Sequence, residues 1–255
     1  MEPITLSMGI FLFVVGFVAS FIDSVVGGGG LVTLPALLMT GLPITHVFGT
    51  NKMAASMGSI TSMTSFIRSG KVDLSLVKWL FPLALVGSGL GAFTVQFIPS
   101  TFLKPLVIVL LIVVAIYTVF KKDWGDISTY QGLSSKRMGL SGLVAFCIGF
   151  YDGFFGPGTG SFLIFAFLLI GFDFVTSSGN AKVLNFASNI AALITFLVLG
   201  YVHYDYGLVM GIGMILGAIA GTKVAILKGA AYVRPLFISI TVILVGKQIW
   251  DILLS

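Results

Sequence analysis

Charged residues are scarce in this sequence: Lys, Arg, Asp and Glu make up 9% of its 255 residues, whereas 57% are hydrophobic. A soluble domain carries about 25% charged residues, so this chain has too few to cover a surface that faces water. Long apolar runs recur along the whole sequence, and a helix in a bilayer satisfies all of its own backbone groups. The sequence therefore predicts an all-α, polytopic membrane protein.

Cysteine and histidine are also nearly absent, which disfavours several classes of site. The single cysteine, Cys147, excludes an intramolecular disulfide. Because one cysteine and two separated histidines cannot form a usual zinc site, no metal or cofactor is expected. The HExxH and GxSxG motifs are missing, so an enzyme is disfavoured, and the Gly27–Gly30 run is not followed by the Gly-Lys-Ser/Thr of a phosphate loop.

The apolar segments form two sets of five with a polar stretch between them. Two segments, 30–41 and 159–171, are shorter than the roughly 20 residues that cross a bilayer, and each follows a glycine-rich break. We therefore expect half-length or re-entrant helices there. The predicted segments are 4–26, 30–41, 46–67, 74–98, 102–120, 138–156, 159–171, 175–199, 206–227 and 232–253.

The second set repeats the first. At a shift of 129 residues Asp23 matches Asp152, and after one extra residue Lys52 matches Lys182 at a shift of 130. Glycines and a basic-Pro-Leu triplet match at the same shifts, so a chance match is an unconvincing explanation. We predict one integrated transport domain made of an N-terminal repeat (1–120), a cytoplasmic linker (121–137) and a C-terminal repeat (138–255).

The basic residues predict how the two repeats are oriented. If each repeat crosses the membrane an odd number of times, the loops near 68–78, 121–137 and 223–234 share one side. By the positive-inside rule this side is cytoplasmic, so both termini face outward and the second repeat is inverted. The same placement explains the net charge of +5 without a nucleic-acid partner. Ten of the 14 Lys and Arg residues fall in these loops: Arg68, Lys71, Lys78, Lys121, Lys122, Lys136, Arg137, Lys223, Lys228 and Arg234.

Four ionisable residues fall inside apolar segments: Asp23, Asp152, Lys52 and Lys182. An ionised side chain in the bilayer costs about 2.5–3.5 kcal/mol, so each needs a compensating role. The two lysines are expected to offer positive charge to an anion. The two aspartates are expected to pair with the lysines or to carry a coupling proton. The alternative is that Asp–Lys ion pairs only hold the helices together.

Polar residues and helix ends near the lysines complete the expected site. Thr50 and Asn51 precede Lys52, and asparagines flank Lys182, although Asn189 is as well explained by a hydrogen bond between helices. A half-helix that begins after a glycine-rich break points unpaired N–H groups at an anion. The predicted substrate-binding residues are Lys52, Lys182, Asn51, Asn180, Asn185, Thr50, Gly29, Gly30, Gly158 and Thr159.

These motifs resemble those of the TauE/SafE family of membrane permeases. The resemblance rests on Phe21–Leu31, Gly49–Lys52, Gly149–Gly160 and Lys182–Asn189, and it extends over essentially the whole chain. It implies transport of small anions across the bacterial inner membrane. The implied substrates are sulfur oxyanions and organosulfonates such as sulfite and sulfoacetate, and export is the usual direction in the family.

The sequence therefore predicts a secondary transporter of a small sulfur-containing oxyanion that works by alternating access between inverted repeats. Proton coupling through Asp23 or Asp152 is compatible with this function. A passive anion channel and a membrane scaffold without transport are the alternatives. The expected partners are the anionic substrate and the lipid bilayer, and a homo-oligomer is compatible with the sequence.

Overall fold

A computed structural model of the chain describes the backbone of residues 4–99, 101–102, 127–132 and 134–253, and the side chains of these residues as far as 228. Within these ranges every regular element is a helix, which confirms the all-α prediction. The helices are α1 (Leu6–Val26), α2 (Gly30–Leu38), α3 (Ile44–Arg68), α4 (Leu74–Val95), α6 (Ser135–Phe154), α7 (Thr159–Ile170), α8 (Phe174–Val198) and α9 (Tyr204–Leu253). The predicted segment at 102–120 lies outside the described residues, apart from its first residue.

Four of the described helices are long and apolar enough to cross a membrane. They are α1, α4, α8 and the first part of α9, Tyr204–Lys228. Helix α3 is 25 residues long, as α8 is, but its many serines and threonines make it less apolar. The structure thus confirms a polytopic helical membrane protein.

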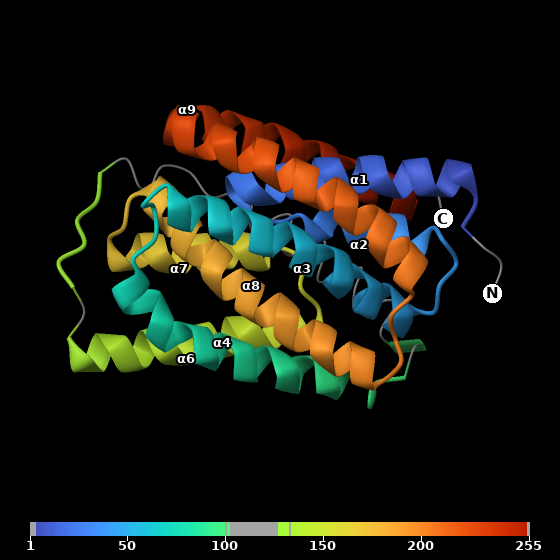
Figure 1. Cartoon of the computed structure of the whole chain (residues 1–255), viewed down its shortest axis with the longest axis horizontal. Helices are drawn as coiled ribbons and strands as arrows, with labels where there is room; N and C mark the ends of the chain where they lie inside the picture. The colour runs from blue at the N-terminus through green and yellow to red at the C-terminus, as the bar shows by residue number, and fades with distance from the viewer. Residues whose placement is uncertain (1–3, 100, 103–126, 133, 254–255) are drawn as a thin grey trace.

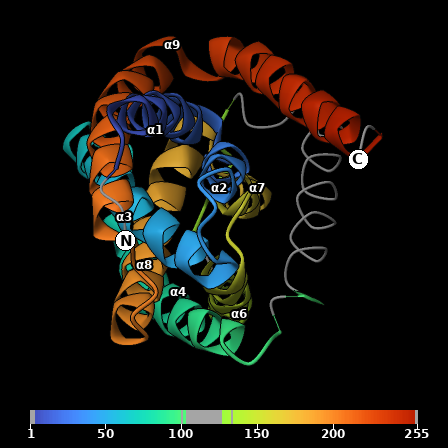
Figure 2. The ribbon, with the colours of Figure 1, turned by 90° about the vertical axis from the view of Figure 1, so that its right-hand side faces the viewer.

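Most predicted boundaries agree with the helices within a few residues, but the prediction of two segments at 206–227 and 232–253 is wrong in one respect. The structure has one continuous helix, α9, across both. Figures 1 and 2 show that this helix reverses direction, so its two arms correspond to the two segments. Residues 228–231 include two alanines, the strongest helix formers, so the chain stays helical there.

Short polar side chains start three of the long helices. The Asp73 carboxylate accepts the backbone N–H of Leu76 at the start of α4, at 3.1 Å. The Asp173 carboxylate accepts the N–H of Thr176 at the start of α8, at 3.0 Å. Ser134 has the same role for α6. These caps satisfy N–H groups that have no partner within the helix, and they fix where each helix enters the bundle.

The helices of the two halves are interleaved. Helices α1 and α9 lie along one side of the bundle, α4 and α6 lie along the other, and α3 and α8 cross between them (Figure 1). The short helices α2 and α7 lie together inside (Figure 2). Helix α1 packs mainly on α9, and α6 packs mainly on α4. The first long helix of each half therefore packs on the fourth helix of the other half.

Glycines bring α4 and α6 into close contact. A Cβ atom at Gly87 would overlap the carbonyl oxygen of Phe146, and one at Gly91 would overlap that of Phe150. Only glycine lets the two backbones approach so closely, as is typical of helix pairs in membranes.

The matching pair, α1 and α9, has the same close backbone contact at glycines, and we call each of these two contacts a glycine seam. A Cβ atom at Gly217 would overlap the carbonyl oxygen of Phe17, and one at Gly221 would overlap that of Phe21. These glycines match Gly87 and Gly91 at the shift of 130, and the phenylalanines match those of α6 at the shift of 129. The sequence repeat is therefore also a repeat of helix contacts.

The two glycine-rich breaks meet at the centre of the bundle. Gly27 and Gly156 adopt φ of 79° and 98°, conformations that favour glycine and that end the preceding helices. A Cβ atom at Gly27 would overlap the backbone of Gly160, so the chain approaches itself too closely there for any side chain. Helices α2 and α7 start from these breaks and run toward opposite ends of the bundle (Figure 1). This confirms the predicted half-length helices.

Two glycines of α4 provide a matched test of the seam. Gly91→Ala should lower the free energy of unfolding by about 1–3 kcal/mol, because its methyl group overlaps the Phe150 carbonyl. Gly89→Ala has only an ordinary contact with Thr195 at 3.9 Å, so it should leave stability unchanged or raise it by up to about 1 kcal/mol. Thermal unfolding of the purified variants in detergent measures both, and equal midpoints would contradict the close packing.

Candidate functional site

A small polar cavity lies where the two breaks face the middle of α3 and α8. Its volume is about 30 Å³, roughly the room of one or two water molecules. Most of its lining is polar side chains or glycine backbone rather than large apolar groups. It is lined by Asp23, Gly28, Gly29, Gly30, Thr33, Asn51, Lys52, Ala55, Asp152, Gly156, Gly158, Thr159, Gly160, Asn185, Asn189 and Met214.

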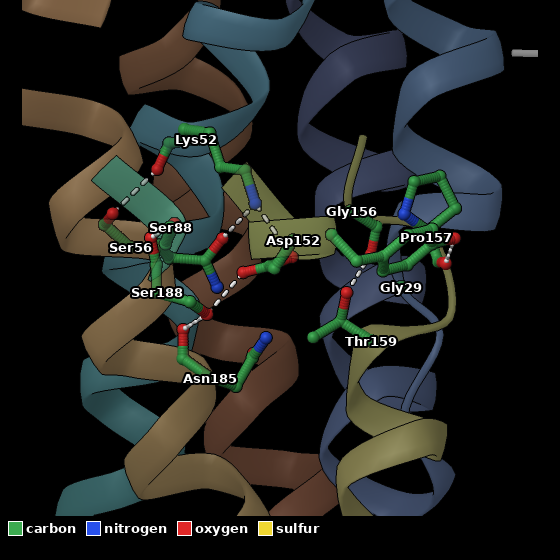
Figure 3. A network of polar contacts seen from close by, with 12 residues as sticks. Gly29, Lys52, Ser56, Ser88, Asp152, Gly156, Pro157, Thr159, Asn185 and Ser188 are labelled. Atoms are coloured by element: carbon green, nitrogen blue, oxygen red, sulfur yellow. Dashed lines mark hydrogen bonds and ion pairs between the residues drawn. The ribbon is translucent and has the colours of Figure 1, made fainter. Parts of the chain in front are cut away.

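Lys52 of α3 and Asp152 of α6 form an ion pair in the wall of this cavity. The distance from Lys52 Nζ to Asp152 Oδ1 is 2.8 Å, and both side chains are 3% exposed. Lys52 Nζ also donates to Oδ1 of Asn189 at 3.1 Å. Figure 3 shows the ammonium group of Lys52 pointing toward the Asp152 carboxylate. The positive charge is therefore fixed at the cavity and nearly removed from solvent.

The second oxygen of Asp152 is held by α8. Ser188 donates its hydroxyl hydrogen bond to Asp152 Oδ2, and the same hydroxyl lies 3.0 Å from the carbonyl oxygen of Asn185 (Figure 3). Ser88 of α4 donates to the carbonyl oxygen of Ser188 at 2.5 Å. Hydrogen bonds therefore join α8 to α6 at the Asp152 carboxylate, and α4 to α8 at the backbone of Ser188.

Lys182 of α8 forms the other ion pair, with Asp23 of α1. The distance from Lys182 Nζ to Asp23 Oδ2 is 2.7 Å, and the lysine is fully buried whereas the aspartate side chain is 17% exposed. Lys182 Nζ also donates to the backbone carbonyl of Asp23. Asp23 Oδ1 accepts the backbone N–H of Gly29 at 3.3 Å. Asp23 lines the cavity but Lys182 does not.

Both ion pairs join one half of the chain to the other. Lys52 comes from the first half and pairs with Asp152 of the second, whereas Lys182 comes from the second half and pairs with Asp23 of the first. The structure thus contains the Asp–Lys pairs that were expected from the sequence, whether the lysines also bind a substrate or the pairs only hold the helices together. Removing one partner of a buried pair strands the other charge, at a cost of about 3–5 kcal/mol.

Thr50 and Asn180, both predicted to bind substrate, hold loops instead of lining the cavity. Thr50 Oγ1 accepts the backbone N–H of His203 at 3.0 Å. Asn180 Oδ1 accepts the backbone N–H of Asp73 at 2.8 Å. Thr50 matches Asn180, and Asp73 matches His203, at the shift of 130. These two equivalent hydrogen bonds, which we call the loop latches, pin a loop at each end of the bundle.

Close packing surrounds each latch in the same way. A Cβ atom at Gly49 would overlap the carbonyl oxygen of Tyr201, and one at Gly179 would overlap that of Lys71. These residues also match at the shift of 130. The loop after α8 therefore lies directly on α3, and the loop after α3 lies directly on α8.

The remaining predicted residues lie at the cavity. Asn51 and Asn185 line it, as do Gly29, Gly30, Gly158 and Thr159. Oδ1 of Asn51 is buried and has no hydrogen-bond partner among the described residues. The hydroxyl of Thr159 donates to the carbonyl oxygen of Gly156 at 2.7 Å.

Sequence reasoning missed several lining residues. Gly28, Gly156 and Gly160 lie inside the predicted breaks, so their position could have identified them. Asn189 is a direct partner of Lys52, although a contact between helices explained it equally well at the sequence level. Ala55 and Met214 carry no chemical signal that could have marked them. Within the described residues, no group of three His, Cys, Asp or Glu side chains is arranged to hold a metal ion.

Comparison with known proteins agrees with this architecture. The model of the sulfite exporter TauE/SafE family matches residues 12–247, which is nearly the whole chain. The chain belongs to the TauE/SafE family. The family assignment makes the protein a membrane transporter, in agreement with its apolar helices.

Curated relatives of this TauE/SafE protein match along almost their full length. A probable membrane transporter protein of Haemophilus influenzae is 41% identical over 241 residues, which cover 94% of each chain. Another from a Sinorhizobium species is 39% identical over 255 residues, with 98% of this chain and 96% of the relative covered. The probable membrane transporter protein YfcA of Escherichia coli K12 is 36% identical over 241 residues, which cover 94% of this chain and 89% of the relative. No solved structure matches the chain.

The latch at Thr50 can be tested with a nearly isosteric change. Thr50→Val removes the acceptor of the buried His203 N–H, so it should lower the free energy of unfolding by about 1–3 kcal/mol. Thr50→Ser keeps the oxygen and should restore most of the loss. Thr61→Val is a matched control in the same helix, because Thr61 only donates to the carbonyl of Met57 one turn earlier. Thermal unfolding in detergent that ranks Thr50→Val with Thr61→Val would contradict the latch.

Proposed function

We propose that this TauE/SafE protein is a secondary transporter that moves a small sulfur-containing oxyanion, of the sulfite or organosulfonate class, across the inner membrane. The observation that carries the proposal is the buried ammonium of Lys52, in a cavity where two half-helices begin. Burying a positive charge inside a membrane protein is expensive, and a binding role for an anion accounts for the expense.

The helix ends support an anionic substrate. Helices α2 and α7 both begin at the cavity, so the positive pole of each helix dipole faces it. The Asp23 carboxylate already accepts the N–H of Gly29, so one of the protein's own anions lies where a substrate oxygen would bind. The side-chain amides of Asn51 and Asn185 provide further donors at the cavity.

The small size of the cavity supports a compact substrate. About 30 Å³ has no room for an organic anion until the helices separate. Sulfite, with three oxygens around one sulfur, needs less opening than an organosulfonate such as sulfoacetate. The sulfur chemistry itself is proposed from the family, whose description is sulfite exporter.

The interleaved halves support alternating access between two inverted repeats, 1–120 and 138–255, joined by the linker 121–137. Helices α2 and α7 run in opposite directions, and the glycine seams, ion pairs and loop latches each occur twice at matching positions. Rocking one repeat against the other would open one loop latch at a time and expose the cavity to one side.

We also propose that both termini face outward and that the basic loops face the cytoplasm. The loop between α3 and α4, the residues just before α6 and the bend of α9 lie at one end of the bundle, and α1 begins at the other (Figure 1). The basic end includes Arg68, Lys71, Lys136, Arg137 and Lys228, which matches the positive-inside rule.

The charge of Lys52 provides the direct test. Lys52→Met in proteoliposomes should reduce sulfite flux and weaken apparent affinity about 10- to 100-fold, since an ionic hydrogen bond contributes about 1.5–3 kcal/mol. Because this variant strands Asp152, the double variant Lys52→Met/Asp152→Asn serves as the folding control. It should unfold at nearly the wild-type temperature and still fail to transport.

The same purified and reconstituted protein can also show which anion is the substrate and whether the protein is a transporter or a channel. Sulfite, sulfoacetate and thiosulfate are compared by flux and by the thermal shift that each produces in detergent. A transporter saturates and shows counterflow of labelled against unlabelled anion, whereas a passive channel does neither. Wild-type sulfite flux in the Lys52→Met variant would refute the proposed site.

A further inference from the structure

The two Asp–Lys pairs have different surroundings, which indicate different roles. We propose that Asp152 is the carboxylate that carries a proton through the transport cycle, binding it when an anion displaces Asp152 from Lys52. The Asp23–Lys182 pair is instead a fixed brace at the break after α1. This inference rests on the proposed transport of an anion at Lys52.

The balance of charge at Lys52 requires a proton. In the structure one ammonium faces one carboxylate, 2.8 Å away and almost without solvent. An anion that binds Lys52 places two negative charges beside one positive charge in the same small cavity. The carboxylate that loses its partner is then a stranded buried charge, which costs about 3–5 kcal/mol. One proton on Asp152 removes this cost and leaves a neutral carboxyl group.

Ser188 can serve both forms of Asp152. With the carboxylate ionised, the Ser188 hydroxyl donates to Asp152 Oδ2, as the structure shows. With Asp152 protonated, the same hydroxyl can accept from the carboxyl group while it donates to the carbonyl oxygen of Asn185, which is already 3.0 Å away. A hydroxyl both donates and accepts, so Oδ2 of Asp152 has a hydrogen-bond partner in both forms.

Asp23 lacks such a partner. Its carboxylate oxygens are bound by Lys182 and by the backbone N–H of Gly29, and both of these groups only donate. The residue that matches Ser188 at the shift of 130 is Gly58, which has no hydroxyl. Lys182 also donates to the Asp23 backbone carbonyl and does not line the cavity. These contacts hold the end of α1 in place and provide no acceptor for the proton of a neutral carboxyl group.

Few other titratable groups face Asp152. Lys52 is its partner from α3, and Asp23 of α1 lies across the cavity, bound to Lys182 of α8. Among the described side chains of α4, α7 and α9, none that lines the cavity is titratable. On α6 itself, the Tyr151 hydroxyl is engaged with the carbonyl of Pro157 at 2.6 Å.

The cycle balances in protons and charge. On one side of the membrane one anion binds Lys52 and one proton from the bulk binds Asp152. On the other side the anion leaves, Asp152 loses its proton to the bulk, and the carboxylate returns to Lys52. A monoanion is therefore carried without net charge, and a dianion carries one negative charge.

The test compares two substitutions of equal size in the full-length protein reconstituted in liposomes. Asp152→Asn mimics the protonated form permanently. We expect its unfolding temperature to fall because Lys52 is left unpaired, and we expect its sulfite accumulation, scaled to the counterflow that the variant itself shows, to be the same with and without a proton gradient. Asp23→Asn is the matched comparison and should still respond to the gradient, although with a lower unfolding temperature. A gradient response in Asp152→Asn, or its loss only in Asp23→Asn, would overturn the assignment.

A measurement on the wild type keeps the proposal testable if Asp152→Asn does not fold. Sulfite flux and the pH inside the vesicles, followed with a dye, should show one proton moving with each anion. Ser188→Ala should weaken the gradient response but not counterflow, and Ser188→Thr should restore it. Normal sulfite flux without proton movement refutes the role of Asp152 alone, whereas absence of any sulfite counterflow refutes the proposed function itself.

Discussion

The structure depends on one electrostatic constraint: a charge inside the membrane-embedded bundle must not be left without a partner. Four charged side chains meet this constraint by pairing across the two halves, Lys52 with Asp152 and Lys182 with Asp23. Each pair brings together a long helix of one half and the helix that precedes the break in the other. A buried pair contributes little net stability, but breaking it is costly. We propose that the same cost makes the pair at the cavity respond to an incoming anion.

Glycine makes this arrangement sterically possible. The breaks at Gly27 and Gly156 end two helices inside the bundle, and their backbones touch where no side chain fits. Free backbone groups at this depth are tolerated because they face a cavity or neighbouring chain rather than lipid. The glycine seams between α4 and α6 and between α1 and α9 hold the outer helices at the distance that the central contacts need. Glycines of the two breaks therefore allow the close packing at the centre and also line the cavity there.

Much of the fold follows from the sequence, because the apolar periodicity, the short segments and the internal repeat each have a physical meaning. The repeat showed that Asp23 is equivalent to Asp152 and Lys52 to Lys182, but equivalence is not contact. Which lysine meets which aspartate depends on how the halves interleave. Thr50 and Asn180 show the same limit: they lie beside the lysines in sequence, yet their side chains point to loops of the other half. The sequence predicted a break between the segments 206–227 and 232–253, but the structure is helical there because local helix propensity carries α9 through its bend.

In the proposed transport cycle the substrate anion binds Lys52 and Asp152 moves away from it. A structure determined with sulfite bound tests this most directly, through the distance from Lys52 Nζ to Asp152 Oδ1, now 2.8 Å. The proposed cycle predicts that the anion lies within hydrogen-bond distance of Lys52 Nζ and that Lys52 and Asp152 separate beyond the roughly 4 Å limit of an ion pair, while the Lys182–Asp23 pair stays closed. An anion bound elsewhere with the Lys52–Asp152 pair intact would contradict it.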